Sequence, residues 1–275
     1  MTRRTKVLAA AAVVVAAAGV SGGGLASGAF ARSRPVVQDS ASSAPVTSAS
    51  FSFTLSLTGL TRHGTVAVSG TGQVDFADDA VSAAVTLPAS VASLIPGGSD
   101  SPTTIDAVLS GGTVYAEIPG LATLVGEPWI SVALPSSVTS GIPAGFSTVA
   151  GALGDVNEIL TFARSHHAKV VSLGSGTVGT TPASVFGIGG RLDGIRLGAK
   201  LWADGSGRLV QASVQAAGHG FSVSGTVDLT DYGAPVTITA PAPSQTRAIP
   251  LSLVESVLGK LLHNGHLGRF LAKAA

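Results

Sequence analysis

Residues 195–241, IRLGAKLWADGSGRLVQASVQAAGHGFSVSGTVDLTDYGAPVTITAP, contain the most regular pattern of the chain and decide its fold class. Apolar and polar residues alternate there over three successive runs separated by Gly-rich turns, and a fourth run opens at Val236 and Ile238. A period of two is typical of strands with one apolar and one polar face. Short Gly-rich turns join antiparallel neighbours. We therefore predict four strands of an antiparallel meander, whose continuous apolar face must be covered by another part of the chain.

Two segments of this stretch also carry a resemblance. K-L-W-A-D-x-x-G-R-L-V over residues 200–210 and D-Y-G-x-P-V-x-I-x-x-P over residues 231–241 resemble the mycobacterial LppX/LprAFG-type envelope lipoproteins. L-x-x-G-x-x-Y-x-x-I followed by W-x-x-V, within residues 109–132, resembles the middle hairpin of the same family. The resemblance is best over residues 197–241 and extends more loosely back to about residue 51. It implies the open half-barrel of the LolA-like lipid carriers, which encloses an apolar cavity for acylated molecules.

The clearest predicted helix lies between the strand runs. Apolar residues recur at three-and-four spacing over residues 144–163, whereas alternating runs cover much of residues 51–134 and 169–192. Gly151 and Gly154 each cost this helix about 1 kcal/mol relative to Ala, so it needs support from the apolar face of the sheet. The predicted fold is therefore α+β and mainly antiparallel β, a curved, open half-barrel sheet with helices covering its concave face.

The composition limits the classes of protein to consider. Charged residues make up 11% of the 275, well below the roughly 25% that is usual, and the chain has no Cys. A disulfide, a thiolate nucleophile and a Cys metal site are thereby excluded. Without the three basic residues near the start (Arg3, Arg4 and Lys6), 13 basic residues stand against 15 acidic ones, and no basic run interleaves with aromatics. We expect no nucleic-acid partner.

Residues 1–31 resemble an export signal. A basic start is followed by 14 small apolar residues (7–20) and by Ala29-Phe30-Ala31, which fits the A-x-A cleavage rule. Because a membrane span needs roughly 20 residues, we favour cleavage over an uncleaved anchor. Residues 25–28, Leu-Ala-Ser-Gly, are close to a lipobox but have Gly28 where the acylated Cys would stand. We therefore expect an exported protein, secreted or in the cell envelope, that is not lipid-anchored through Cys.

The remaining domain boundaries follow from changes in composition. Residues 32–48 form a Ser/Pro-rich linker that is too polar to pack, and residues 49–246 form the half-barrel ligand-binding domain. Residues 247–275 are predicted to form an amphipathic C-terminal helix with a basic remainder. This helix could pack on the domain, make peripheral contact with an anionic membrane, or fray.

No constellation of residues points to catalysis. His166-His167 are adjacent, so they cannot face one ligand sphere, and His263 and His266 have no evident third ligand. The chain contains no G-x-S-x-G or S-x-x-K nucleophile motif, and no pair of carboxylates stands out. We expect no catalytic residue, no metal and no cofactor. Tyr115, Trp129 and Trp202 lie on the polar phase of their strands, where they either pack or contact a ligand at a rim.

The sequence thus predicts a non-catalytic protein that binds or carries lipid or lipid-like molecules in an apolar cavity. A second reading is a structural or interaction module of the envelope with a filled core. Small side chains (Ala, Val and Gly) favour a roomy cavity. The residues expected to line it are Phe53, Leu55, Leu109, Val132, Phe146, Val149, Leu153, Leu160, Val214 and Val223.

Overall fold

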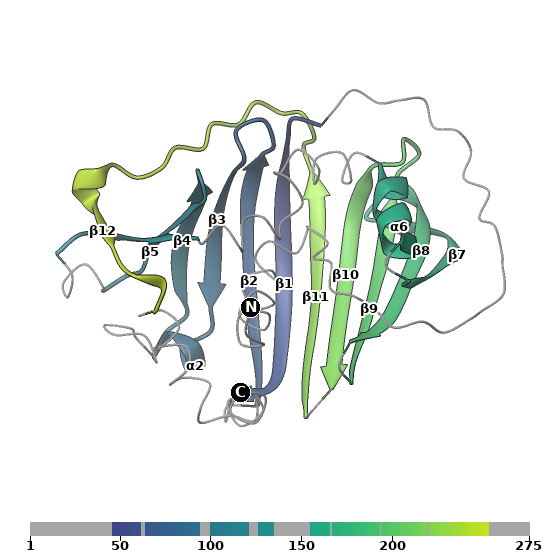
Figure 1. The fold of residues 1–275 in the computed structure, drawn as a ribbon, viewed down its shortest axis with the longest axis horizontal. Coiled ribbons are helices and arrows are strands. Elements are labelled where there is room, and N and C mark those ends of the chain that lie inside the picture. The colour runs from purple at the N-terminus through teal and green to yellow at the C-terminus, as the bar shows by residue number, and fades with distance from the viewer. Residues whose placement is uncertain are drawn as a thin grey trace.

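The computed structural model describes residues 46–61, 64–93, 100–120, 126–134, 155–165, 167–192, 194–218 and 220–252. These residues form one 12-stranded sheet with few helices (Figure 1). The strands are β1 (Ser48–Thr61), β2 (Gly64–Asp75), β3 (Ala80–Leu87), β4 (Thr103–Ser110), β5 (Thr113–Glu117), β6 (Trp129–Ala133), β7 (Lys169–Val178), β8 (Thr181–Leu192), β9 (Ile195–Ala203), β10 (Leu209–Gly218), β11 (Phe221–Thr230) and β12 (Thr246–Ala248). The helices are α2 (Ala89–Ala92), α6 (Val156–Ser165) and a 3-10 turn, η1 (Pro243–Gln245).

The sheet consists of two meanders joined along their first and last strands. Its order is β12-β6-β5-β4-β3-β2-β1-β11-β10-β9-β8-β7, so β1 to β6 run outward in one direction and β11 back to β7 in the other. Every pairing is antiparallel except that of β12 with β6. The sheet is open, with β7 and β12 at its edges. The prediction of a mainly antiparallel, curved and open sheet is confirmed.

Strand register separates the side chains into two faces. Phe53 of β1 lies opposite Val227 of β11, Val227 opposite Ala212 of β10, Ala212 opposite Leu201 of β9, and Leu201 opposite Phe186 of β8. Residues that are directly opposite point to the same face, so this row crosses five strands on one face. We call it the inner face, because the helix α6 packs on it. The other face, which carries the alternate residues of each strand, is the outer face.

The helix α6 packs at one end of the inner face. Its buried residues are Val156, Ile159, Leu160 and Ala163, of which the first three share a cluster with inner-face residues such as Phe186 and Leu201. Asp155 begins the helix by accepting a hydrogen bond at Oδ1 from the backbone N–H of Asn157 (2.9 Å). The N–H of Val156 donates to the carbonyl of Gly207 in the β9–β10 turn (2.9 Å). These bonds fix the start of the helix against the end of the sheet. The part of the predicted helix before residue 155 lies outside the described residues.

The predicted fourth strand of the 195–241 meander was wrong. Three strands form, β9 to β11, and then residues 231–242 make an extended strap across the end of the sheet toward β12 (Figure 1). Pro235 and Pro241 lack the N–H that a ladder needs. The strap is held instead where it begins, by Gly233 N–H donating to Ser48 O (2.9 Å) and by Ser48 Oγ donating to Ala234 O (2.5 Å).

The predicted boundary of the C-terminal helix was also too early. Arg247 and Ala248, assigned to that helix from sequence, lie in β12 and pair in parallel with Ile130 and Ser131 of β6. Ile249 continues this pairing through its N–H, which donates to Ser131 O (2.9 Å). The backbone hydrogen bonds of β6 thus decide the structure of these three residues. Residues 253–275 lie outside the described part of the chain.

Candidate functional site

Most of the residues predicted to line a cavity share the inner face. Leu55 faces Val68, Val214 faces Ala199, and Leu109 and Val132 both face Val114. Phe53 and Val223 belong to the same face through β11. Leu160 belongs instead to α6 and is buried in the core between that helix and the sheet, with 0% of its surface exposed. Phe146, Val149 and Leu153 lie outside the described residues.

The half of the inner face away from α6 is less buried than the half beneath it. Two rows cross it, one through Leu55, Gly225, Val214 and Ala199 and the other through Leu57, Val223, Ala216 and Leu197. We call these the lower inner rows. Their residues are half-buried, and Leu197 is 37% exposed. Among the described residues the buried cluster does not include them. An apolar surface therefore continues beyond the packed core.

Two aromatic rings of β1 lie along the inner face, over the neighbouring strand β2. A Cβ built on Gly70 of β2 would stand 2.7 Å from Cε1 of Phe53, and one built on Gly72 would overlap the ring of Phe51. Each ring therefore covers a glycine on the neighbouring strand. The two ring centroids are 6.4 Å apart and the planes are tilted by 32°. Phe51 and Phe53 add apolar area to the inner face at the level of its backbone.

An open groove of about 740 Å³ lies on the outer face. It crosses β1 to β4, and Trp129 of β6 borders it. Most of its lining residues are polar or small and belong to the outer-face phase of their strands. This groove could not be recognised from the sequence, because alternating Ser and Thr are typical of any solvated face. Its lining residues are Ser50, Phe51, Ser52, Thr71, Gly72, Gln73, Ser82, Ala83, Ala84, Asp106, Ala107, Val108, Trp129 and Thr230.

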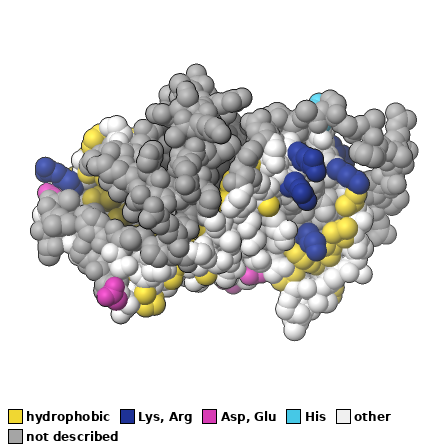
Figure 2. Space-filling view, turned by 90° about the horizontal axis from the view of Figure 1, so that it is seen from below, with side chains coloured by type: hydrophobic (Ala, Val, Ile, Leu, Met, Phe, Trp, Pro, Cys, Tyr) yellow, Lys and Arg dark blue, Asp and Glu magenta, His cyan; other side chains and the backbone are white. Residues whose placement is uncertain are grey.

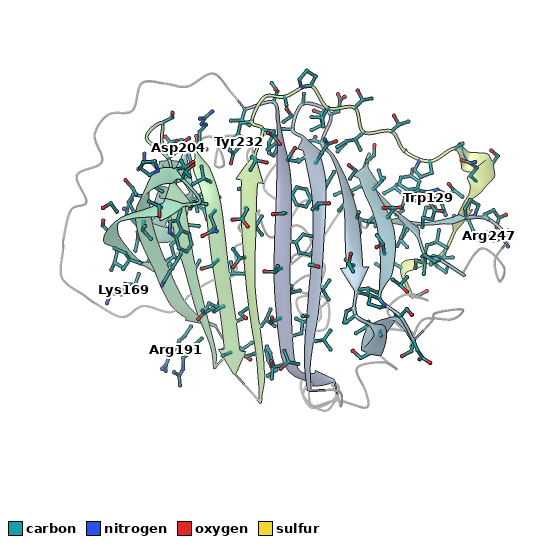
Figure 3. The ribbon with its side chains drawn as sticks, turned by 180° about the vertical axis from the view of Figure 1, so that it is seen from behind. Trp129, Lys169, Arg191, Asp204, Tyr232 and Arg247 are labelled. Atoms are coloured by element: carbon teal, nitrogen blue, oxygen red, sulfur yellow. The ribbon has the colours of Figure 1, made fainter. Side chains whose placement is uncertain are left out.

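Tyr115, Trp129 and Trp202 were predicted either to pack or to contact a ligand at a rim. Trp202 lies beside β7 and β8, 3.7 Å from where a Cβ on Gly176 would stand, measured to its indole Nε1. Tyr115 lies opposite Val108 and Ser131. Trp129 borders the groove at the far end of the sheet (Figure 3). Of the three, Trp129 is thus the one placed to contact a ligand on the outer face.

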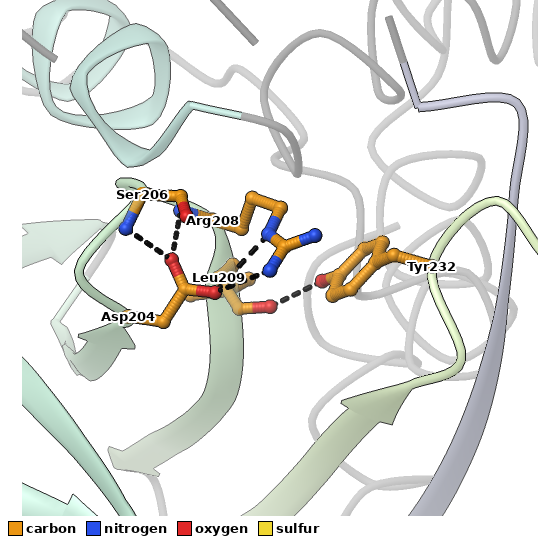
Figure 4. Close-up of polar contacts among 5 residues, drawn as sticks. All are labelled: Asp204, Ser206, Arg208, Leu209 and Tyr232. Atoms are coloured by element: carbon orange, nitrogen blue, oxygen red, sulfur yellow. Dashed lines mark hydrogen bonds and ion pairs between the residues drawn. The ribbon is translucent and has the colours of Figure 1, made fainter. Parts of the chain in front are cut away.

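The two segments that carry the family resemblance form a polar cluster at one end of the sheet (Figure 4). Asp204 accepts hydrogen bonds at Oδ1 from the N–H groups of Ser206 (2.8 Å) and Arg208 (3.0 Å), and at Oδ2 from Nε (3.1 Å) and Nη2 (3.0 Å) of Arg208. The guanidinium of Arg208 lies 5.5 Å from the ring centroid of Tyr232. The carboxylate therefore closes the β9–β10 turn and orients the arginine toward the strap.

Tyr232 completes this cluster from the strap. Its Oη donates a hydrogen bond to the carbonyl of Leu209. Burial raises the pKa of Tyr232 well above its usual value, the negative charge of Asp204 raises the pKa further, and Arg208 opposes the shift. A hydroxyl held protonated and bonded to a backbone carbonyl cannot serve as a base near neutral pH. The cluster joins the turn, the strap and β10.

The described residues contain no group of three or more His, Asp or Glu placed to hold a metal ion. His167 stands in the turn after α6 at a φ of 61°, and His166, His263 and His266 lie outside the described residues. Within the same part of the chain, no helix is both long and apolar enough to cross a membrane.

Comparison with known proteins finds no matching family model and no matching curated protein. Among solved structures, the chain is similar to LprF from Mycobacterium bovis, with 13% identity and a TM-score of 0.37 over 72% of this chain and 90% of that one. It is also similar to the Mycobacterium tuberculosis lipoprotein LppX, with 12% identity and a TM-score of 0.39 over 70% and 90% of the two chains. A third similar structure is MucB in complex with MucA, with 16% identity and a TM-score of 0.28 over 72% and 53%. Similarity at these levels does not bear on ligand or activity.

Proposed function

We propose that this protein binds a lipid or another apolar molecule against the lower inner rows, without catalysing a reaction on it. The observation that supports the proposal most is that these rows stay half-exposed beside a packed core. They present Leu55, Leu57 and Val223 among small residues such as Ala199 and Ala216. The resemblance of the segments 200–210 and 231–241 to lipid-carrying envelope lipoproteins implies the same class of ligand.

The lower inner rows keep apolar area that a ligand could bury. Each methylene group that leaves water for an apolar surface contributes about 0.8 kcal/mol. From Leu55 on β1 to Ala199 on β9 there are three strand spacings, or roughly 14 Å, enough for an acyl chain to lie across several strands. Small side chains leave room for it at the level of the sheet. The proposed ligand is therefore long and apolar.

We also propose that the protein acts outside the cytoplasmic membrane. The signal-like residues 1–31 and Gly28 at the lipobox position support an exported protein that is not lipid-anchored through Cys. The other function kept from the sequence is a structural or interaction module with a filled core. The filled-core reading predicts a protein that purifies without lipid and does not bind acyl probes.

The test introduces a bulky side chain into the lower inner rows and, as a control, the same side chain on the outer face. Ala216 lies on the inner face and its neighbour Ala217 on the outer face of the same strand. We expect Ala216→Phe to lose co-purifying lipid in native mass spectrometry and to bind the fluorescent fatty acid cis-parinaric acid at least tenfold more weakly. Ala217→Phe should bind it as the unsubstituted protein does.

Two results would refute the proposal. One is an unsubstituted protein that carries no lipid and does not bind cis-parinaric acid or a panel of other acyl ligands, which would favour the filled-core module. The other is equal loss of binding in Ala216→Phe and Ala217→Phe while both remain folded by circular dichroism, since binding would then not depend on the inner face.

A further inference from the structure

One end of the outer face is strongly basic. Residues 169–200 contain four basic side chains and one acidic one, Asp193, and the strands β7 to β10 contain no Asp or Glu. Register places the four basic residues on one face. Lys200 lies opposite Gly187, Lys169 opposite Gly189, and Arg191 opposite Arg196. Like charges directly opposite each other destabilise a sheet, so the Arg191–Arg196 pair favours a bound anion.

The same face exposes aliphatic side chains. Val171 is 37% exposed and Leu173 50% exposed, and both are among the most exposed large apolar residues of the described chain. Both lean over Gly187, where a Cβ would stand 3.1 Å from Val171 Cγ2 and 3.3 Å from Leu173 Cδ1. They therefore lie beside Lys200. Space-filling and stick views show Lys and Arg side chains with hydrophobic ones at this end of the molecule (Figures 2 and 3).

We infer that the outer face of β7 to β9 docks on the surface of an anionic lipid bilayer. Cationic side chains beside protruding aliphatic ones are the pattern of proteins that lie at a membrane interface. The arginines and lysines attract the headgroups, and Val171 and Leu173 enter the boundary with the acyl chains. A single-stranded nucleic acid would be favoured by bases stacking on exposed aromatic side chains, whereas the exposed large apolar residues described here are aliphatic.

The centre of this face leaves room for a headgroup. Gly189 and Gly198 lie opposite each other between the basic residues, and a Cβ on either would meet no atom within 4 Å. A phosphate group can therefore approach the backbone while Arg191, Arg196 and Lys200 surround it. Because this surface is on the face opposite the lower inner rows, docking does not depend on the proposed ligand binding there.

The experiment is co-sedimentation of the full chain with phosphatidylcholine vesicles, with and without one third phosphatidylglycerol. We expect binding to the anionic vesicles alone, weakening with added salt. Since each basic residue contributes roughly a fivefold factor, Arg191→Gln with Arg196→Gln should weaken binding roughly 25-fold. Leu173→Ser should weaken it several-fold at a salt concentration where charge is screened. Arg247→Gln, at the opposite edge of the sheet, is the matched control and should bind normally.

The inference would be overturned by any of four results. The first is an unsubstituted protein that stays in the supernatant with anionic vesicles. The second is a double variant that binds as well as the original. The third is an Arg247→Gln variant that loses binding by roughly fivefold or more. Tighter binding to a DNA duplex than to anionic vesicles at the same salt would also refute it. Binding of cis-parinaric acid by the double variant, measured separately, distinguishes failure here from failure of the proposed function.

Discussion

The phenyl ring of Phe53 on β1 covers Gly70 on β2, so that a Cβ on Gly70 would be 2.7 Å from the ring and 2.5 Å from the carbonyl oxygen of Ala84. Both distances are shorter than van der Waals contact, so the added atom would overlap its neighbours. Glycine is required here by the close approach of its neighbours, and the packing of the inner face depends on it.

We predict that Gly70→Ala destabilises the protein by about 1–3 kcal/mol, because the added methyl group forces the ring or the Ala84 backbone to move. Denaturant unfolding followed by circular dichroism measures the change. Gly189→Ala is the matched control, since its Cβ would meet no atom within 4 Å, and its stability should change little. Equal losses in the two variants would show that the ring can move aside without cost.

Leu160 provides a test of how α6 is held. It is 0% exposed and packs in the cluster with Phe186 and Leu201. Leu160→Ala should lower the free energy of unfolding by about 2–5 kcal/mol, because it removes buried methyl groups and leaves a cavity. Thr161→Ala, at the exposed neighbouring position, should have little effect in the same thermal or denaturant melts. A loss below 1 kcal/mol in Leu160→Ala would mean that α6 is not part of the cooperative core.

Tyr232 predicts a dependence of stability on alkaline pH. Its folded-state pKa is raised, whereas an unfolded tyrosine titrates near 10. Below about pH 10 both states are protonated and the stabilisation is complete. At higher pH the unfolded chain loses the proton first, so the free energy of unfolding falls as pH rises toward the folded-state pKa.

The variant Tyr232→Phe should remove this fall and should cost about 1–2 kcal/mol at neutral pH through the lost bond to Leu209 O. Denaturant melts between pH 8 and pH 12 compare the two proteins, and Tyr115, present in both, contributes equally to each. If the two curves of stability against pH run parallel above pH 10, the raised pKa does not contribute to folding.

The faces of the strands could be predicted from sequence, because a period of two fixes which side chains share a face. Phe53, Leu55, Val214 and Val223 were placed on one face correctly for that reason. The short turns correctly predicted that β9, β10 and β11 are neighbours, but the partners of strands far apart in sequence could not be predicted, since periodicity does not report which of them lie side by side. The pairing of β1 with β11 and the parallel pairing of β12 with β6 are set by contacts between distant parts of the chain.

The sequence-based predictions of secondary structure were wrong where the local pattern and the long-range contacts favour different structures. Val236 and Ile238 alternate like a strand, but the prolines around them prevent a ladder, and the strap forms instead. Arg247 and Ala248 were assigned to the C-terminal helix from a change in composition, but the free edge of β6 offers hydrogen bonds that make them a strand. The basic face of β7 to β9 was not found because its residues come from three strands and gather only through register.

The position of β1 at the middle of the sheet has a consequence for the time course of folding. Its two neighbouring strands are synthesised at different times. The strand β2 follows β1 directly, whereas Thr230 of β11, which pairs with Ser50, is synthesised 180 residues later. At synthesis rates of 5–20 residues per second, that delay is on the order of ten to forty seconds. Throughout it, one edge of β1 is an unpaired strand with Phe51, Phe53, Leu55 and Leu57 along one side. Such an edge can pair with another incomplete chain, so association between copies of this chain is a hazard until β11 is in place.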